Sequence, residues 1–285
     1  MTGIIIKGIG GFYYVKCEDG NVYECKARGV FRNKNIKPTI GDNVEIETLK
    51  GKGNIVKIEE RRTSLVRPPV SNVDNLMIVV AAKEPDPDFG LIDKILVTAE
   101  FKGINPIICV NKTDLDDGKE IVDNYEKSGY KVLCVSTYED DGIEELKAVL
   151  KDKVTAFAGL SGVGKSSILN KLIETDAETG DISEKIKRGK HTTRHVELFE
   201  LEDGGFIFDT PGFSSFEMEN IKASELYEYF PEMRNVSGCR FKGCAHINEP
   251  DCVVKEMVEN GEIPIKRYEN YKEIYDILKI RKDWE

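Results

Sequence analysis

The stretch Gly159-Leu160-Ser161-Gly162-Val163-Gly164-Lys165-Ser166 dominates our interpretation of the fold, because it matches the phosphate-loop pattern G-x-x-x-x-G-K-[ST]. An apolar run at 154–157 precedes the motif, and a run that favours a helix follows at 166–173. This is the strand–loop–helix context that phosphate binding needs, since glycines let backbone N–H groups turn toward phosphates and the helix N-terminus favours negative charge. The stretch therefore predicts a nucleotide phosphate site.

Two segments that precede this loop in the chain indicate which base is bound. The segment Asn111-Lys112-Thr113-Asp114 matches the guanine-specificity pattern N-K-x-D, and its first residue ends a strand-like run at 106–111. The Asp114 carboxylate can accept hydrogen bonds from guanine N1–H and N2–H₂, whereas adenine presents neither donor in that arrangement. The Lys112 stem can lie along the base, and Asn111 can tie the loop together. Ser136 ends a later strand and fits the loop that contacts guanine O6.

Two segments after the phosphate loop match the switch elements of a GTP-binding protein. Asp209-Thr210-Pro211-Gly212 fits the pattern D-x-x-G, in which Asp209 would hold Mg²⁺ through water and the Gly212 amide would contact the γ-phosphate. Thr192 or Thr193 is the expected Mg²⁺ ligand of the first switch. Lys165 is expected to reach the outer phosphates and Ser166 to bind Mg²⁺. The full set expected to bind nucleotide is Asn111, Lys112, Thr113, Asp114, Ser136, Gly159, Leu160, Ser161, Gly162, Val163, Gly164, Lys165, Ser166, Ser167, Asp209 and Gly212.

The order of these motifs is unusual, because N-K-x-D and the base loop come before the phosphate loop rather than after D-x-x-G. The same α/β sheet can form if the old chain ends are joined and a new break follows D-x-x-G, which circular permutation tolerates when the ends lie close at the surface. Strand-like and helix-like runs alternate through residues 70–216, as in a mostly parallel sheet covered on both faces. The sequence thus predicts a circularly permuted P-loop domain at 67–216.

Residues 1–66 show a different pattern, with five short strands expected at 3–9, 12–16, 22–26, 43–49 and 54–59 between glycine-rich turns. This pattern is typical of an OB-type barrel. Residues 1–69 contain thirteen Lys and Arg against eight Asp and Glu, a net charge of +5 in a chain of net charge −10. The basic loop 28–37 carries Phe31 and no acid. Such a loop suits a single-stranded nucleic-acid groove, and a solvated loop is an equally good interpretation.

Four potential zinc ligands lie within fourteen residues of the third expected domain, 217–285, which is helix-rich and polar: Cys239, Cys244, His246 and Cys252. Cys₃His is a structural zinc set, and four protein ligands leave no open position for catalysis. Free thiols or redox chemistry are the alternatives. The other cysteines, Cys17, Cys25, Cys109 and Cys134, lie in apolar strand-like runs and are expected to be at least half-buried.

The combination of permuted order, G-x-S-G-V-G-K-S-S at 159–167, G-x-H-T-T at 189–193, D-T-P-G-F at 209–213 and the zinc set resembles the ribosome small subunit-dependent GTPase A family of bacteria. The resemblance spans the whole chain. It implies a Mg²⁺-dependent GTP hydrolase that binds the small ribosomal subunit and its rRNA late in subunit assembly, with hydrolysis stimulated by the subunit. Leu160, Ser161 and Lys190 depart mildly from the family pattern.

The resemblance also implies that His191 is catalytic, together with Lys165, Thr192 and Thr193. Phe213 stands where many GTPases carry the Gln that orients the attacking water, so another group or a partner must supply this function. An exposed loop histidine without a catalytic role is the alternative for His191. The chain is expected to be a cytoplasmic monomer that contacts no membrane. A GTPase acting on the large subunit and an RNA-binding scaffold without useful turnover are the competing functions.

Overall fold

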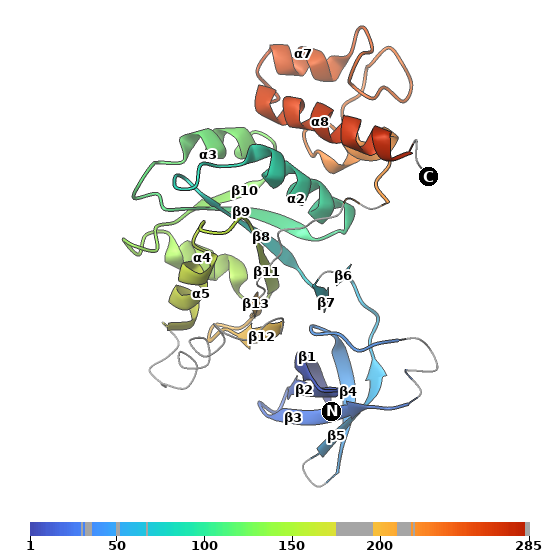
Figure 1. Cartoon of the computed structure of the whole chain (residues 1–285), viewed down its shortest axis with the longest axis vertical. Helices are drawn as coiled ribbons and strands as arrows, with labels where there is room; N and C mark the ends of the chain where they lie inside the picture. Colours follow the sequence, from blue (N-terminus) through green and yellow to red (C-terminus); the bar gives the residue numbers. More distant parts are fainter. Residues whose placement is uncertain are drawn as a thin grey trace. The chain divides into compact units, whose positions relative to one another are not determined.

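The first five strands close into a small barrel in the computed structural model (Figure 1). They pair in the ring β1-β2-β3-β5-β4-β1, in which only the β3–β5 pair is parallel. This is the closed Greek-key arrangement of an OB-type barrel, as the sequence predicts. The strands are β1 (Thr2–Ile9), β2 (Phe12–Cys17), β3 (Val22–Ala27), β4 (Asn43–Leu49) and β5 (Lys52–Ile58).

Alternating apolar side chains fill the barrel. Ile5, Val15, Cys25 and Ile55 are fully buried, because every second residue of a strand faces the same side. Phe31 is only 7% exposed and belongs to this core. The sequence places Phe31 in the basic loop 28–37 without indicating this burial, which follows from the barrel's need to cover its own interior.

The structure describes residues 1–29, 31, 36–49, 52–66, 68–174, 196–209, 218 and 220–282. Within these ranges the chain forms two compact units. The first comprises Met1–Leu76, Ile143–Ala158 and Lys165–Ser215, and the second comprises Met77–Gly142, Gly159–Gly164 and Phe216–Glu285. No helix within the described ranges has the length and apolar character needed to cross a bilayer.

The first unit continues from the barrel into further strands and two helices. Strand β12 pairs with both β1 and β13, and β13 runs parallel to β11. A short hairpin, β6–β7, is absent from the sequence-based expectation because its strands have only three residues each. The elements are β6 (Ser64–Val66), β7 (Pro69–Ser71), α4 (Ile143–Leu150), β11 (Val154–Ala158), α5 (Lys165–Glu174), β12 (Glu197–Glu200) and β13 (Phe206–Asp209).

A buried carboxylate ties the barrel to this hairpin. Asp42 is fully buried and accepts hydrogen bonds from Arg61 Nε at 2.7 Å, Ser71 Oγ at 2.5 Å and the Thr39 amide at 2.8 Å. Because its oxygens are well supplied with donors, the carboxylate avoids most of the cost of burial. These hydrogen bonds to Asp42 therefore attach the barrel to the β6–β7 hairpin.

The second unit contains the parallel pair β9–β10 and the helix-rich C-terminal segment. Helix α2 begins at an N-cap, where Asp88 Oδ1 accepts from the Leu91 amide at 2.9 Å, and its apolar face is buried. The elements are β8 (Asn75–Ala81, in this unit from Met77), α2 (Phe89–Phe101), β9 (Asn105–Asn111), α3 (Lys119–Glu126), β10 (Lys131–Cys134), the 3₁₀ helix η2 (Ala223–Tyr229), α7 (Val253–Glu259) and α8 (Ile265–Lys282).

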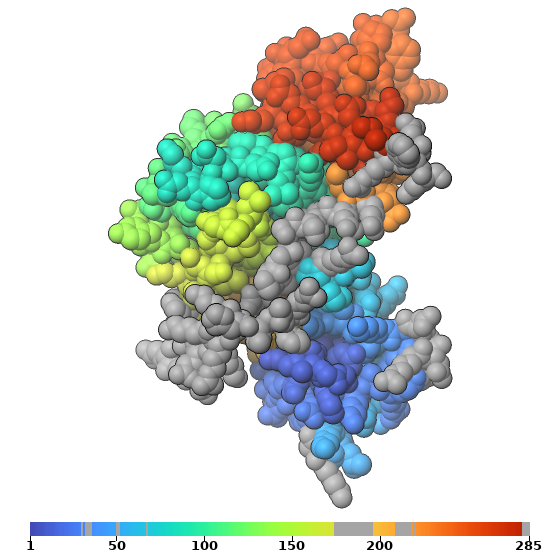
Figure 2. Space-filling view, viewed as in Figure 1, coloured from blue at the N-terminus to red at the C-terminus, as the bar shows by residue number. Residues whose placement is uncertain are grey.

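One apolar core joins α2, η2 and α8. Leu226, Phe230 and Tyr271 are fully buried in it, and the Phe230 and Tyr271 rings meet edge to face at 5.1 Å. In the space-filling view, α8 and the segment before it, red and orange, form a closely packed surface (Figure 2). Of the four cysteines expected to be at least half-buried, Cys17, Cys25 and Cys109 are buried, but Cys134 is exposed because it ends its strand at the edge of the sheet.

Candidate functional site

The phosphate loop follows directly from the end of β11 and leads into the first turn of α5. Gly159 and Gly164 both have positive φ, at +133° and +95°. A Cβ at Gly159 would lie 2.2 Å from the Val79 carbonyl oxygen, and a Cβ at Gly164 would lie 2.1 Å from Asn111 Nδ2. Only glycine fits at either position, so the loop is pressed against β8 and against the N-K-x-D segment.

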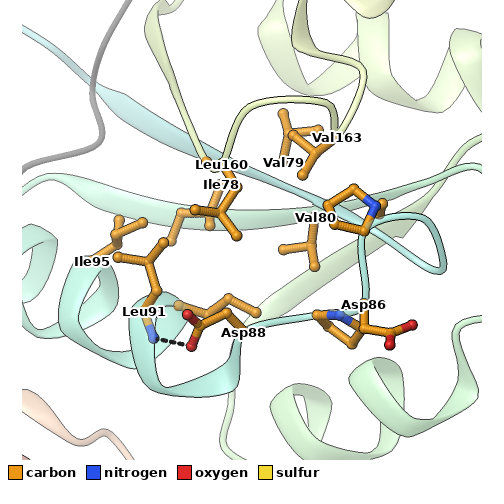
Figure 3. A pocket seen from close by; sticks show the side chains of 14 residues that line it. Ile78, Val79, Val80, Asp86, Asp88, Leu91, Ile95, Leu160 and Val163 are labelled. Atoms are coloured by element: carbon orange, nitrogen blue, oxygen red, sulfur yellow. Dashed lines mark hydrogen bonds between the residues drawn. The ribbon is translucent and has the colours of Figure 1, made fainter.

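Two apolar side chains of the phosphate loop face β8 and α2. Leu160 and Val163 line a small pocket whose other walls are Ile78, Val79 and Val80 of β8 and the first turns of α2 (Figure 3). Val163 is 3% exposed, whereas Ser161 and Gly162 between the two anchors are exposed. The loop is thus held by its apolar residues while Ser161 and Gly162 remain accessible, which is compatible with a phosphate cradle.

Asn111 connects the base-recognition segment to the phosphate loop. Its side chain is fully buried and donates from Nδ2 to the Val163 carbonyl at 3.0 Å. Within the described part of the chain, Asn111 Oδ1 is buried without a hydrogen-bond partner, an unsatisfied group typical of sites that await a ligand or water. The next residue, Lys112, has a φ of +63°, and its amine donates to the Glu84 carbonyl.

Asp114 and Ser136 lie together, as guanine recognition requires. Ser136 Oγ donates to Asp114 Oδ1 at 2.7 Å and also accepts from the Glu139 amide at 3.1 Å. The Thr113 amide donates to the Val135 carbonyl at 3.3 Å, which draws the two loops side by side. Asp114 is exposed while Ser136 is fully buried, so the carboxylate is fixed from beneath and keeps capacity to accept from a base.

The remaining predicted residues are placed less completely. Ser166 and Ser167 are exposed in the first turn of α5. Lys165 is half-buried, and burial lowers the pKa of its amine, a cost that phosphate oxygens would offset. Asp209 ends β13, but its side chain lies outside the description. His191, Thr192, Thr193 and Gly212 lie outside the described residues altogether.

The four expected zinc ligands converge in the second unit. The candidate ligand atoms of Cys239, Cys244, His246 and Cys252 all lie within 4.8 Å of one another. The Cys244 and Cys252 sulfurs are 3.8 Å apart, and His246 Nδ1 lies 3.8 Å from the Cys239 sulfur and 3.3 Å from the Cys252 sulfur. Sulfurs at the corners of a zinc tetrahedron with bonds of about 2.3 Å are about 3.8 Å apart, so these residues fit a structural Zn²⁺.

The pKa shifts of two candidate ligands are consistent with binding of a metal cation. Burial lowers the pKa of His246, which keeps the imidazole in the neutral form that ligates metals. Burial raises the pKa of the Cys244 thiol to about 12, so this group would not become a thiolate here without a compensating positive charge.

We call residues 239–252, which carry the four candidate ligands, the zinc loop. Side chains that are not ligands hold this loop in place. The Glu249 carboxylate accepts from the Ala245, Ile247 and Asn248 amides at 2.9–3.1 Å. From α8, Tyr268 donates to the His246 carbonyl at 2.8 Å and Tyr271 donates to the Ala245 carbonyl at 2.7 Å. The zinc loop is therefore attached to α8 by two hydroxyl groups.

Sequence reasoning missed the ionic cluster that attaches α8 to α2. Arg267 is fully buried, with Nη1 2.5 Å from Asp93 Oδ1 and Nε 2.7 Å from Glu232 Oε1. Asn270 Nδ2 donates to the second Asp93 oxygen at 2.6 Å, and the Phe230 ring lies 4.4 Å from the guanidinium. Asp93 and Arg267 are 174 residues apart, and no local pattern marks either. Through α8 this cluster joins the zinc loop to the helix beside the phosphate loop.

Comparison with known proteins identifies the family of GTPases to which this site is similar. Residues 58–219 match the RsgA GTPase family model, and residues 2–56 match the model of the RsgA N-terminal domain. The small ribosomal subunit biogenesis GTPase RsgA of Ruminiclostridium cellulolyticum is 50% identical over 98% of this chain and 94% of its own length. The protein of that name from Agathobacter rectalis is 47% identical, with full coverage of both chains.

Two solved structures share the fold. The crystal structure of YloQ, a circularly permuted GTPase, superimposes with a TM-score of 0.84, and its sequence is 39% identical to this chain. The match covers 98% of this chain and 95% of YloQ. YjeQ from Thermotoga maritima is 39% identical and has a TM-score of 0.85, covering 97% and 98%. The permuted α/β fold expected from the order of the motifs is confirmed, and the chain belongs to the RsgA GTPase family.

Proposed function

We propose that this GTPase binds the small ribosomal subunit, hydrolyses GTP late in subunit assembly, and is stimulated by the subunit. The observation that carries the guanine part is the Asp114–Ser136 pair, held at 2.7 Å in the same unit as the phosphate loop. The subunit part is supported by the printed names of relatives that share about half of this sequence over nearly its whole length.

Each of the predicted residues is expected to contact a different part of the bound nucleotide or its Mg²⁺. The Asp114 carboxylate reads the guanine N1–H and N2–H₂ edge, and the amides of Gly159–Gly164 face the phosphates. Lys165 neutralises charge on the outer phosphates. Ser166 and Asp209 are the residues that would hold Mg²⁺, which supplies charge neutralisation on the same oxygens when bound.

We assign the catalytic role to His191, with Thr192 or Thr193 as the first-switch ligand. The support is chemical: Phe213 offers no group that can orient water, and His191 directly precedes the two threonines. Its matched control is His195, four residues later in the same segment. H191A is expected to remove most of the stimulated rate and to leave GTP affinity nearly unchanged, whereas H195A retains both.

The barrel offers a surface that suits RNA. A groove on it is lined by Gly10, Gly11, Phe12, Tyr13, Lys26, Ala27, Arg28, Phe31, Ile36, Lys37 and Pro38. The Lys26 amine lies 4.9 Å from the centre of the Phe12 ring, which is half-exposed. Partly exposed aromatic rings among cations are how single-stranded nucleic acids are bound without base specificity. Phe12 thus adds a partly exposed ring to a groove that the largely buried Phe31 also lines.

These roles suggest three functional segments: an RNA-binding barrel at 1–66, the GTPase domain at 67–216 and the zinc-binding domain at 217–285. The boundaries of the two matched family models, 2–56 and 58–219, support the first division. The second switch leads straight into the zinc-binding segment in this permuted order. We place the protein in the cytoplasm as a monomer, with small-subunit rRNA as its partner.

The test is steady-state phosphate release from GTP with purified small subunits, large subunits and neither. The proposal predicts slow release alone and a rise only with small subunits, since Phe213 leaves the water unoriented until a partner orders the site. By reciprocity, the subunit should bind the GTP form more tightly than the GDP form. Three equal rates would contradict the proposal and favour the scaffold function, and stimulation by large subunits alone would contradict the choice of partner.

A further inference from the structure

The turn between the first two zinc ligands, Cys239–Cys244, points an aromatic ring into solvent. Phe241 is 44% exposed, and its neighbours Arg240, Lys242 and Gly243 are exposed, whereas Cys244 is buried. We call residues 239–244 the zinc turn. Because its two ends are metal-ligand candidates 5 residues apart, bound zinc would fix the shape of the turn.

Two contacts of Arg240 surround the exposed Phe241 ring. The Arg240 guanidinium lies 5.6 Å from the centre of the Phe241 ring and pairs with Asp251 Oδ2 at 2.8 Å. The Arg240 and Asp251 side chains are 64% and 67% exposed, so this ion pair is weak and can be exchanged for another anion. Gly243, with a φ of +70°, allows the tight return of the chain to Cys244.

We infer that the zinc turn is a docking point for an unpaired RNA nucleotide, whose base stacks on Phe241 while Arg240 and Lys242 contact its phosphates. The inference rests on the proposed function, which supplies RNA as the partner. Charge selects this occupant: an aromatic face between two cations matches a base joined to phosphates, whereas an apolar protein face would bury both cations without partners. A rigid turn also presents the ring at little entropic cost.

The test is equilibrium binding of the full-length, zinc-loaded protein, with a non-hydrolysable GTP analogue, to purified small subunits and to a short unpaired RNA oligonucleotide. F241A should weaken both interactions about five- to a hundred-fold, the range for loss of one stacked base. F241W should bind like the wild type, because it keeps a stacking face. K242Q should lower the dependence of binding on log salt concentration by about one unit. Zinc content and Tm of each variant establish that the turn is folded.

The matched control is I280A, which removes an apolar side chain that is 62% exposed on α8, in the same unit but outside the zinc turn, and should leave both affinities unchanged. Wild-type affinity of F241A, or equal loss in F241A and F241W, would overturn the inference. So would ultraviolet cross-links that join residues 239–244 to a ribosomal protein rather than to RNA. If the wild type binds the oligonucleotide through Phe241 but ignores small subunits, the inference holds and the proposed function fails.

Discussion

The zinc loop and the base-recognition loops lie in the same unit but are held together by different forces. In the base-recognition loops, protein groups bind one another: Asn111 bonds to Val163 at 3.0 Å, and Ser136 bonds to Asp114 at 2.7 Å. In the zinc loop, hydrogen bonds to Glu249 and from Tyr268 and Tyr271 hold the backbone. Its three thiols and imidazole, however, face one another within 4.8 Å, an arrangement that suits a bound cation. The comparison teaches that the base-recognition loops are held by hydrogen bonds between protein groups, whereas the zinc loop is expected to need its cation in order to fold.

Zinc removal is the largest expected effect. Chelation, or C244S, should unfold residues 239–252 and release them to hydrogen exchange, since structural zinc contributes on the order of 10 kcal/mol in small zinc domains. GTP affinity should change less than about threefold, because the nucleotide loops keep their own hydrogen bonds. Metal analysis of protein purified without added zinc should find about one equivalent. Native protein with no metal and all seven thiols titratable would contradict the zinc assignment.

Arg267 provides the next largest effect, because it attaches α8, whose tyrosines hold the zinc loop, to α2. R267M leaves Asp93 and Glu232 buried without their cation and should lower the free energy of unfolding by about 3–5 kcal/mol, measured in urea. K266M is the matched control: Lys266 is 43% exposed and pairs with exposed Glu120, so its loss should cost less than about 1 kcal/mol. Equal effects of the two variants would show that burial of the cluster does not matter in solution.

Gly164 tests whether the phosphate loop is preformed against Asn111. G164A would place a Cβ 2.1 Å from Asn111 Nδ2 at a φ of +95° and should weaken GTP binding about ten- to a hundred-fold through a strain of about 1–3 kcal/mol. G90A is the control, since its Cβ would meet only the Asp88 side chain at 3.5 Å. Calorimetric titration with GDP checks both, and unchanged affinity of G164A would mean that the loop rearranges freely.

Ser136 gives the smallest effect. S136A removes one hydrogen bond to Asp114, which is worth about 0.5–1.5 kcal/mol, so guanine nucleotides should bind about two- to tenfold more weakly. Affinities for GDP and for ADP separate a change in base recognition from a general loss. A matched loss for both nucleotides would refute a base-specific role for the Ser136 hydroxyl.

Sequence alone predicted the parts of this molecule that local chemistry determines. The alternating strands of the barrel, the glycines of the phosphate loop and the spacing of the zinc ligands each follow from rules that act over a few residues. The strand expected to end at Ser136 ends instead at Cys134, because Ser136 forms a bridge with Asp141. Local chemistry thus defines elements well and their ends less well.

Long-range pairing lay beyond sequence reasoning. The Arg267–Asp93 pair and the Asp42–Arg61–Ser71 joint each unite residues that no periodicity relates, and isolated charged residues in sequence indicate solvent rather than burial. Phe31 shows the converse: a basic loop suggested exposure, but the barrel needed a large side chain to fill its core. Such choices depend on volumes and partners that appear only once the chain has folded.

Nucleotide selectivity of Asp114 variants tests the guanine site most directly. The account predicts that the wild type binds GTP but not ATP, and that D114N weakens GTP binding about 100-fold or more through loss of charge-assisted hydrogen bonds. The same variant should gain affinity for xanthosine triphosphate, whose 2-oxo group can accept from the new amide. Competition against a fluorescent guanine nucleotide measures all three affinities. Equal binding of ATP and GTP by the wild type, or a D114N variant that still prefers GTP to xanthosine triphosphate, would contradict the account.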